Sequence, residues 1–288
     1  MNKRAVNISS LVILLSLLSF IAEVCVYYFI PYHWISVAFA GITSLAISHF
    51  CLESSLDYDY SFIHASFMVI SSLAFAAIIY IIQPNQWIQY DFSMVFLVLV
   101  NWLVPFFYSC LRDLFDRGPR FDGYHSFFRR MSRLFIVVFL FTIIKQYFLT
   151  PIVPPYEEMP FGAHNFVPFM ATATYIETAL RNNLSLLPLF AYVAEIICMG
   201  IPIGFFCRIY CNKLMLFFRL VIYFAIPIFL EILQYAAGLG RGDIDDVALS
   251  LMGILIGVIL FHIMNGAYQS VSNRDFMMSR IQNSKYFY

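Results

Sequence analysis

The stretch Phe229-Leu-Glu-Ile-Leu-Gln-Tyr-Ala-Ala-Gly-Leu-Gly-Arg-Gly-Asp-Ile-Asp-Asp-Val247 places a glutamate, a glutamine, an arginine and three aspartates within and between two strongly apolar runs. The flanking runs, Leu214–Ala237 and Ile244–Met264, are each long enough to cross a hydrocarbon layer of ~30 Å at ~1.5 Å per helical residue. Polar and ionisable side chains are rare inside membrane spans because burying them in hydrocarbon is costly. The stretch therefore predicts two transmembrane helices joined by a short turn, with polar groups gathered at one membrane face.

The composition of the whole chain supports this interpretation. Hydrophobic residues make up 61% of the 288 residues and charged residues only 12%, and the mean hydropathy is +0.79. Soluble globular domains are nearer half apolar and a quarter charged. The sequence predicts an all-α, polytopic integral membrane protein. It contains no basic tract with interleaved aromatics, so no nucleic-acid partner is expected.

The cysteines and histidines indicate no metal centre. The six cysteines form no CxxC pair and no Cys/His metal spacing, and most lie in or beside apolar runs, so they are expected to be reduced and structural. No cofactor is implied.

Apolar runs of spanning length predict about eight transmembrane helices. The runs are Ile8–Ile30, Trp34–Leu52, Phe62–Ile82, Phe92–Leu111, Leu134–Leu149, Leu187–Cys207, Leu214–Ala237 and Ile244–Met264. The fifth run is short and carries Lys145, whose long side chain is expected to reach toward the nearer interface. The segment Met170–Leu186, between the fifth and sixth runs, is expected to form a short helix at the membrane interface.

Positive charge falls in alternate loops. The loop 112–133 alone carries six arginines, whereas the loops on the opposite side carry only Arg181 and Arg241. The positive-inside rule therefore predicts cytoplasmic termini and an outward-facing turn between Glu231 and Asp246. The loop 112–133 also contains several phenylalanines, and we interpret it as an interfacial segment on anionic lipid, with a partner-binding site as the alternative.

Several motifs in the second half of the chain resemble the VanZ-like family of bacterial membrane proteins. They are Asn165-Phe-Val-Pro168-Phe169, Ile201-Pro202-Ile-Gly204, Glu231-x-x-Gln234, the turn with Gly238, Gly240 and Arg241, Asp243-x-x-Asp246-Val247 and Gly253-x-x-x-Gly257. Two positions depart from the family pattern, because Glu195-Ile196 and Ser250 stand where such proteins usually carry asparagine.

The resemblance implies a multi-pass protein of the bacterial cell (plasma) membrane. Its role would be at the cell envelope, linked in that family to antibiotic resistance, namely lowered susceptibility to the lipoglycopeptide-type antibiotic teicoplanin. The expected parts are an N-terminal four-helix membrane region (1–111), a basic aromatic cytoplasmic loop (112–133), a VanZ-like membrane domain (134–265) and a cytoplasmic tail (266–288). The expected partners are membrane lipids, a cell-wall precursor or a glycopeptide.

The candidate site combines the polar turn with the preceding outer loop. Glu231 and Gln234 share one helix face, and Arg241 is the natural partner for Glu231. Asp243 stands at the N-cap of the last helix, where a carboxylate binds free N–H groups, and Asp246 is expected to face the bundle. The loop is expected to meet the turn and to roof a cavity. The proposed ligand-binding residues are Glu231, Gln234, Arg241, Asp243, Asp246, Asn165, Pro168, Phe169 and Glu195.

Other functions fit the same residues. In a membrane enzyme acting on a lipid-linked substrate, Glu231 or Asp246 would be the catalytic acid or base. In a proton-coupled transporter, Glu195 and Glu231 would relay protons. The carboxylates also fit a divalent cation, and a Glu231–Arg241 ion pair fits a purely structural role. Asp245 is expected to be solvated.

Overall fold

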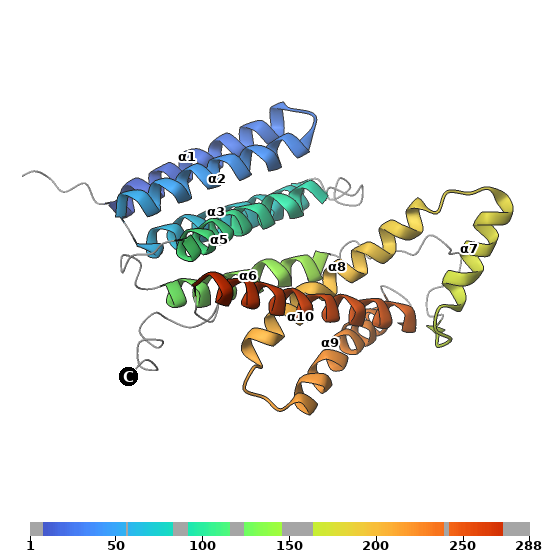
Figure 1. The fold of residues 1–288 in the computed structure, drawn as a ribbon. Coiled ribbons are helices and arrows are strands. Elements are labelled where there is room, and N and C mark those ends of the chain that lie inside the picture. Colours follow the sequence, from blue (N-terminus) through green and yellow to red (C-terminus); the bar gives the residue numbers. More distant parts are fainter. Residues whose placement is uncertain are drawn as a thin grey trace, which may run out of the picture. The chain divides into compact units, whose positions relative to one another are not determined.

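The computed structural model describes residues 8–55, 57–82, 92–115, 124–145, 164–238 and 242–272. In these residues it contains nine helices and two very short strands (Figure 1). Seven of these helices are long and apolar enough to cross a membrane. The prediction of an all-α, polytopic membrane protein is therefore confirmed. The chain divides into two compact units, residues 1–140 with 267–288 and residues 141–266, which we describe separately.

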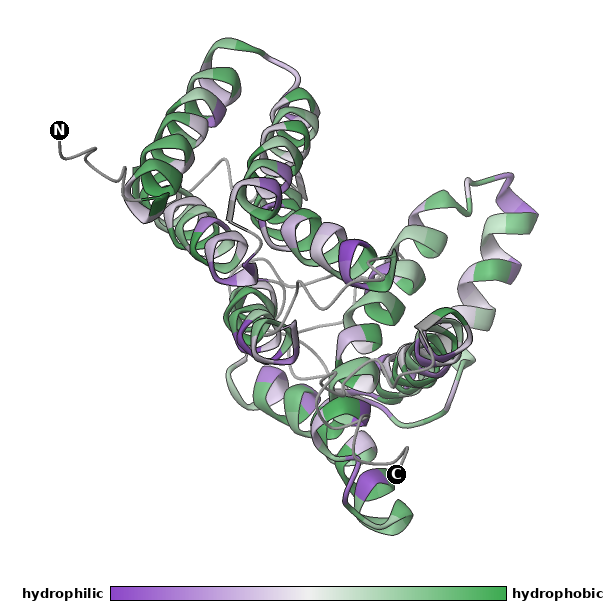
Figure 2. Cartoon of the chain, turned by 60° about the vertical axis from the view of Figure 1, so that its left-hand side comes forward, coloured by the Kyte–Doolittle hydropathy of each residue, from purple (hydrophilic) through white to green (hydrophobic). Residues whose placement is uncertain are grey.

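The first unit is built on four antiparallel helices that follow the first four predicted runs. They are α1 (Ile8–Phe29), α2 (His33–Ser55), α3 (Tyr58–Ile82) and α5 (Phe92–Phe115). Both α1 and α5 pack against α2 and α3. Apolar residues extend along nearly the whole length of these helices (Figure 2), as expected for surfaces that face lipid.

The next helix begins earlier than the apolar run predicted. Helix α6 spans Tyr124–Ile143, so the second half of the predicted cytoplasmic loop is helical. The physical reason is an amphipathic pattern, in which aromatic and apolar residues recur at helical spacing and are buried while the arginines between them are not. The buried apolar residues on this face are Tyr124, Phe127, Phe128, Met131, Phe135 and Val138. The Trp102 indole on α5 also donates a hydrogen bond to the Met131 carbonyl at 2.7 Å.

Two of the loop arginines are paired within the protein. Arg112 forms an ion pair with Glu53 at 2.5 Å, and Arg130 pairs with Asp59. Glu53 lies near the end of α2 and Asp59 in the first turn of α3. The two arginines therefore neutralise acidic side chains of the protein.

The second unit contains the last three predicted spans. Helix α8 (Leu187–Tyr210) and helix α9 (Leu216–Ala236) lie within it, as does α10 (Ile244–Ser272) up to residue 266. The predicted interfacial helix is present as α7 (Met170–Asn182). The two short strands, β1 (His164–Asn165) and β2 (Gly242–Asp243), pair in parallel.

Helices α8 and α10 touch backbone to backbone. A Cβ atom on Gly204 would lie 1.9 Å from the Ile254 carbonyl oxygen, and one on Gly257 would lie 2.1 Å from the Ile201 carbonyl oxygen. These distances leave room only for hydrogen. The small-residue motifs Gly200-x-x-x-Gly204 and Gly253-x-x-x-Gly257 therefore form the ridge where the two helices meet, as such motifs do in membranes.

Candidate functional site

The outer loop and the turn before α10 meet through β1 and β2. Asn165 pairs with Asp243 in the parallel bridge, and the Asn165 side-chain amide donates to Asp243 Oδ1 at 3.0 Å. The Asn165 side-chain oxygen accepts from the Val167 backbone N–H at 3.1 Å, which turns the loop away from the strand. The paired residues of the two strands are 78 positions apart in the sequence, so the outer loop and the turn meet as the sequence predicted.

Asp243 caps α10 and connects it to α9. Its Oδ1 accepts a hydrogen bond from the Asp245 backbone N–H at 3.0 Å, which is the capping contact predicted for this position. Its own backbone N–H donates to Glu231 Oε1 at 2.7 Å. Both carboxylates are buried, with 8% of Glu231 and 3% of Asp243 exposed. Glu231 therefore fixes the turn through a backbone hydrogen bond.

Asp245 is buried, and the prediction that it is solvated was wrong. None of its surface is exposed. Its carboxylate accepts from the Phe169 backbone N–H at 2.6 Å and from the Thr172 hydroxyl at 3.1 Å. The backbone of Phe169 lies in the left-handed region, with φ at 58°, which is unfavourable for a bulky residue. The loop before α7 covers the side of α10 that helical periodicity had assigned to solvent.

Asp246 lies one residue further into α10 and is half buried. It accepts a hydrogen bond from the Tyr192 hydroxyl of α8. Tyr192 is itself buried and packs with Ile196 and Leu249. The contact shows that Asp246 faces the neighbouring helix, as predicted, and joins α8 to α10.

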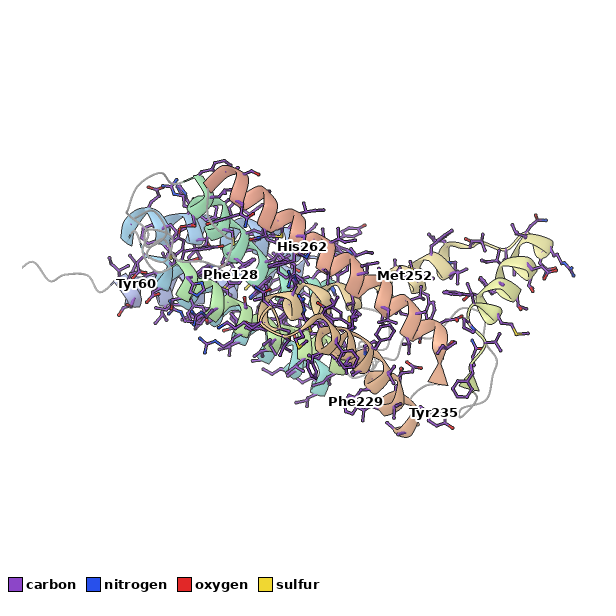
Figure 3. All side chains as sticks on the ribbon, turned by 60° about the horizontal axis from the view of Figure 1, so that its bottom comes forward. Tyr60, Phe128, Phe229, Tyr235, Met252 and His262 are labelled. Atoms are coloured by element: carbon purple, nitrogen blue, oxygen red, sulfur yellow. The ribbon has the colours of Figure 1, made fainter. Side chains whose placement is uncertain are left out.

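A pocket of about 560 Å³ lies between α9, the turn and the outer loop. Most of its wall is apolar, and Glu231 and Asp243 are its acidic residues. The lining residues are Phe166, Ile228, Glu231, Ile232, Tyr235, Gly242, Asp243, Ile244 and Val247. Phe229 and Tyr235 can be located on α9 in Figure 3; Tyr235 belongs to the lining and Phe229 does not.

The remaining predicted residues lie elsewhere or outside the described residues. Pro168 and Phe169 are exposed in the loop and are not part of the described pocket wall, and Gln234 is buried on α9. Arg241 falls outside the described residues, so its predicted pairing with Glu231 stays a prediction. Glu195, in the middle of α8, interacts electrostatically with Lys145.

Lys145 is buried, with only 4% of its surface exposed. Its side chain therefore lies among protein side chains. The opposite charge of Glu195 lowers the cost of burying an ammonium group there.

Sequence reasoning missed three contributors to the site. Tyr192, Thr172 and Asp245 hold the loop and the helices in place, but none belongs to a recognisable motif. For Asp245, the sequence feature that indicates its role is the Asp243-x-Asp245 spacing at a helix start, where acidic side chains bind backbone N–H groups.

The carboxylates of this region thus act mainly as hydrogen-bond acceptors for the protein itself. In the described parts of the chain, no three acidic, histidine or cysteine side chains come together as a cation site. What the arrangement offers a ligand is a mainly apolar pocket with an acidic end formed by Glu231 and Asp243.

Comparison with protein-family models places the pocket within a known family. A family model described as VanZ/LLP1 matches residues 133–265, which include every residue of the pocket and its hydrogen-bond network. Searches of curated proteins and of solved structures found no match.

Proposed function

Because residues 133–265 belong to the VanZ-like family, we propose that the protein acts at the bacterial cell envelope, in the plasma membrane, and lowers susceptibility to teicoplanin-type glycopeptides. It does so by holding the lipid part of an envelope lipid, a cell-wall precursor or the antibiotic itself in the pocket beside α9. The observation that carries the proposal is the pocket, which combines an apolar wall with two acidic residues at the turn.

The size and chemistry of the pocket favour a lipid-bearing ligand. A volume of about 560 Å³ is in the range of sites that bind small organic molecules. Its α9 wall is formed by Ile228, Ile232 and Tyr235, which recur at helical spacing and are each at least 41% exposed. In a membrane-spanning helix such side chains face lipid, so a hydrocarbon chain can enter from the bilayer.

The acidic end of the pocket indicates which polar groups the ligand should carry. Glu231 and Asp243 are held in fixed positions by the Asp243 N–H and by Asn165, respectively. Carboxylates accept hydrogen bonds and attract cations, so the polar part of the ligand should present a donor or an amine near the turn. Lipid-linked amino sugars, aminoacylated precursors and glycopeptides all offer such groups.

The test uses a host that lacks the gene, complemented with wild-type chain or with variants expressed at equal levels. We expect the wild type to lower teicoplanin susceptibility. Glu231→Gln should return it to that of the host, because the substitution replaces a charged acceptor oxygen with an amide N–H₂ that cannot accept from a ligand donor or attract an amine. A hydrogen bond to a charged group is worth about 1.5–3 kcal/mol, or about ten-fold or more in affinity. Vancomycin serves as the comparison glycopeptide.

A pair of tryptophan substitutions separates the pocket from the rest of α9. Ile228→Trp fills the pocket, whereas Phe229→Trp enlarges an exposed side chain next to it on the same helix. Loss of the teicoplanin effect with Ile228→Trp but not Phe229→Trp would support the pocket. If the wild-type chain itself has no effect on susceptibility, the proposed antibiotic role is wrong.

A further inference from the structure

The four helices of the first unit enclose a line of buried polar residues. On α1, Ser16, Ser19 and Glu23 recur at helical spacing and are at most 7% exposed, although α1 is otherwise among the most apolar helices. The other three helices supply matching residues. The polar seam consists of Ser16, Ser19 and Glu23 on α1, Ser36, Ser44 and Ser48 on α2, Ser61, His64 and Ser72 on α3, and Ser93, Asn101, Ser109 and Asp113 on α5.

The seam is as long as a membrane is thick. Ser93 and Asp113 stand at its two ends on α5, twenty positions apart, which corresponds to ~30 Å at ~1.5 Å per residue. Near the Asp113 end, Ser61 and Ser109 are hydrogen bonded at 3.1 Å and the Tyr58 hydroxyl donates to Asp113. This is the end that also carries the Glu53–Arg112 ion pair.

Asn101 fixes the carboxyl group of Glu23 in the middle of the seam. Its side-chain amide donates to Glu23 Oε2 at 3.1 Å and to the Ser72 hydroxyl at 2.9 Å. Its side-chain oxygen accepts from Ser44 at 3.0 Å. Both amide hydrogens and the oxygen are therefore used, so the hydrogen-bond network sets the orientation of Asn101 and of Glu23.

A second contact favours one tautomer of neutral His64. The Ser16 hydroxyl donates its only hydrogen to the Val12 carbonyl at 2.8 Å. Its 2.8 Å contact with His64 Nδ1 must then be one in which the imidazole N–H donates. In the neutral ring this leaves a lone pair on Nε2, and His64 is completely buried. Nε2 is thus a buried base.

Four polar atoms between these two contacts have no hydrogen-bond partner. In the described part of the first unit, they are Glu23 Oε1, Ser19 Oγ, Ser48 Oγ and His64 Nε2. Ser19 lies one helical turn from Glu23, and Ser48 lies one turn from Ser44, both toward the level of His64. Leaving such atoms unsatisfied costs about 1–3 kcal/mol each, which points to a site for bridging water or a moving proton.

We propose that the seam is a proton pathway in which Glu23 and His64 exchange a proton. The O–H bond of the Glu23 carboxyl group breaks and an N–H bond forms at His64 Nε2, with the Ser19 and Ser48 hydroxyls and intervening water as carriers. The products are a carboxylate and an imidazolium, so net charge is conserved. This function belongs to the first unit and does not depend on the VanZ-like region.

The surroundings of the pair suit this exchange. The buried residues of α1, α2, α3 and α5 include no lysine or arginine that would hold Glu23 permanently ionised. The other buried titratable groups on these helices, or packed against them from α6 and α10, are Tyr27, Cys51, Tyr58, Cys110, Asp113, Tyr124 and Tyr268. Of these, Asp113 is the acceptor at the end of the seam, and it is bound by two tyrosine hydroxyls.

The test is proton flux into liposomes that contain the purified full chain, driven by a potassium diffusion potential and followed with an entrapped pH dye. Flux above that of protein-free liposomes is expected for the wild type. Glu23→Gln and His64→Asn should each lower it at least ten-fold. The asparagine retains an amide N–H in the place of Nδ1–H for Ser16 but offers no base at the position of Nε2.

A hydroxyl pair provides the matched control. The double variant Ser19→Ala/Ser48→Ala removes the proposed carriers, whereas Ser66→Ala removes another buried hydroxyl without a partner, on α3 but outside the seam. The first should lose flux and the second should keep it. The proposal is overturned if wild-type flux equals that of empty liposomes, or if correctly folded Glu23→Gln conducts like the wild type. Infrared spectra showing a protonated carboxyl band that Glu23→Gln removes would support it even if His64→Asn fails to fold.

Discussion

Asp245 holds the end of the outer loop next to α7. Its carboxylate accepts hydrogen bonds from the Phe169 backbone N–H and from the Thr172 hydroxyl. The backbone of Phe169 has a left-handed conformation. Asp245→Ala should free this segment, because hydrogen bonds to a charged acceptor are worth about 1.5–3 kcal/mol. We expect proteolytic cleavage within residues 166–172 to become about ten-fold faster, since cleavage follows the population of the open segment.

A carboxylate on α7, the helix that follows the loop, serves as the control. Glu177→Gln alters an exposed pair with Arg181 on α7, which contributes little to stability. Its cleavage rate should match that of the wild type. Equal rates for Asp245→Ala and the wild type would show that Asp245 does not restrain the loop.

Asp243 and Asp245 also show what could be predicted for single residues. The capping role of Asp243 follows from its place directly before a helix, which is local information. The burial of Asp245 depends on a loop from about 75 residues earlier lying over α10, and helical periodicity contains no such information. The same limit explains Lys145, whose acidic neighbour Glu195 is distant in the sequence.

At the scale of elements, the α8–α10 contact depends on four glycines. Gly204→Ala would place a Cβ atom 1.9 Å from the Ile254 carbonyl oxygen, so the helices must separate. We expect the melting temperature in detergent to fall by several degrees, since overpacking typically costs about 1–3 kcal/mol. Gly266→Ala on α10 meets nothing within 4 Å and should leave the melting temperature unchanged or raise it slightly. Equal melting temperatures for the two variants would contradict the close contact.

The elements themselves were largely predictable, because hydrophobic runs of membrane length are strong signals. The first four helices, α8, α9 and α10 follow the predicted runs. The start of α6 was missed for a physical reason. Its first ten residues bury Phe127, Phe128 and Met131 against protein while arginines cover the other side, so average hydropathy is low where amphipathic packing is good.

At the scale of the whole molecule, the polar seam could not be predicted because each member is an isolated polar residue, in most cases a serine, within an apolar run. Ser16, Ser19 and Glu23 on α1 are three and four residues apart, and Ser44 and Ser48 on α2 are four apart, so they form a helical pattern that is visible once burial is known. A search for polar residues at helical spacing within the predicted spans would have found this pattern. It would not have shown which residues of the other helices form hydrogen bonds with it. Which helices pack together to join Glu23 to Asn101 depends on tertiary structure.

The proposed function requires the turn between α9 and α10, and with it the pocket, to lie on the outer side of the membrane. The distribution of positive charge predicts that the α2–α3 connection is cytoplasmic and the α7–α8 connection is outside. Two cysteine substitutions at exposed positions test this, Ser54→Cys and Asn182→Cys. On intact cells, a membrane-impermeant maleimide should label Asn182→Cys, whereas Ser54→Cys should react only after permeabilisation. Labelling of the wild-type chain gives the background signal from the native cysteines. The reverse pattern would turn the pocket toward the cytoplasm, where an externally added glycopeptide does not reach it, and the ligand would have to be a lipid or precursor of the inner leaflet.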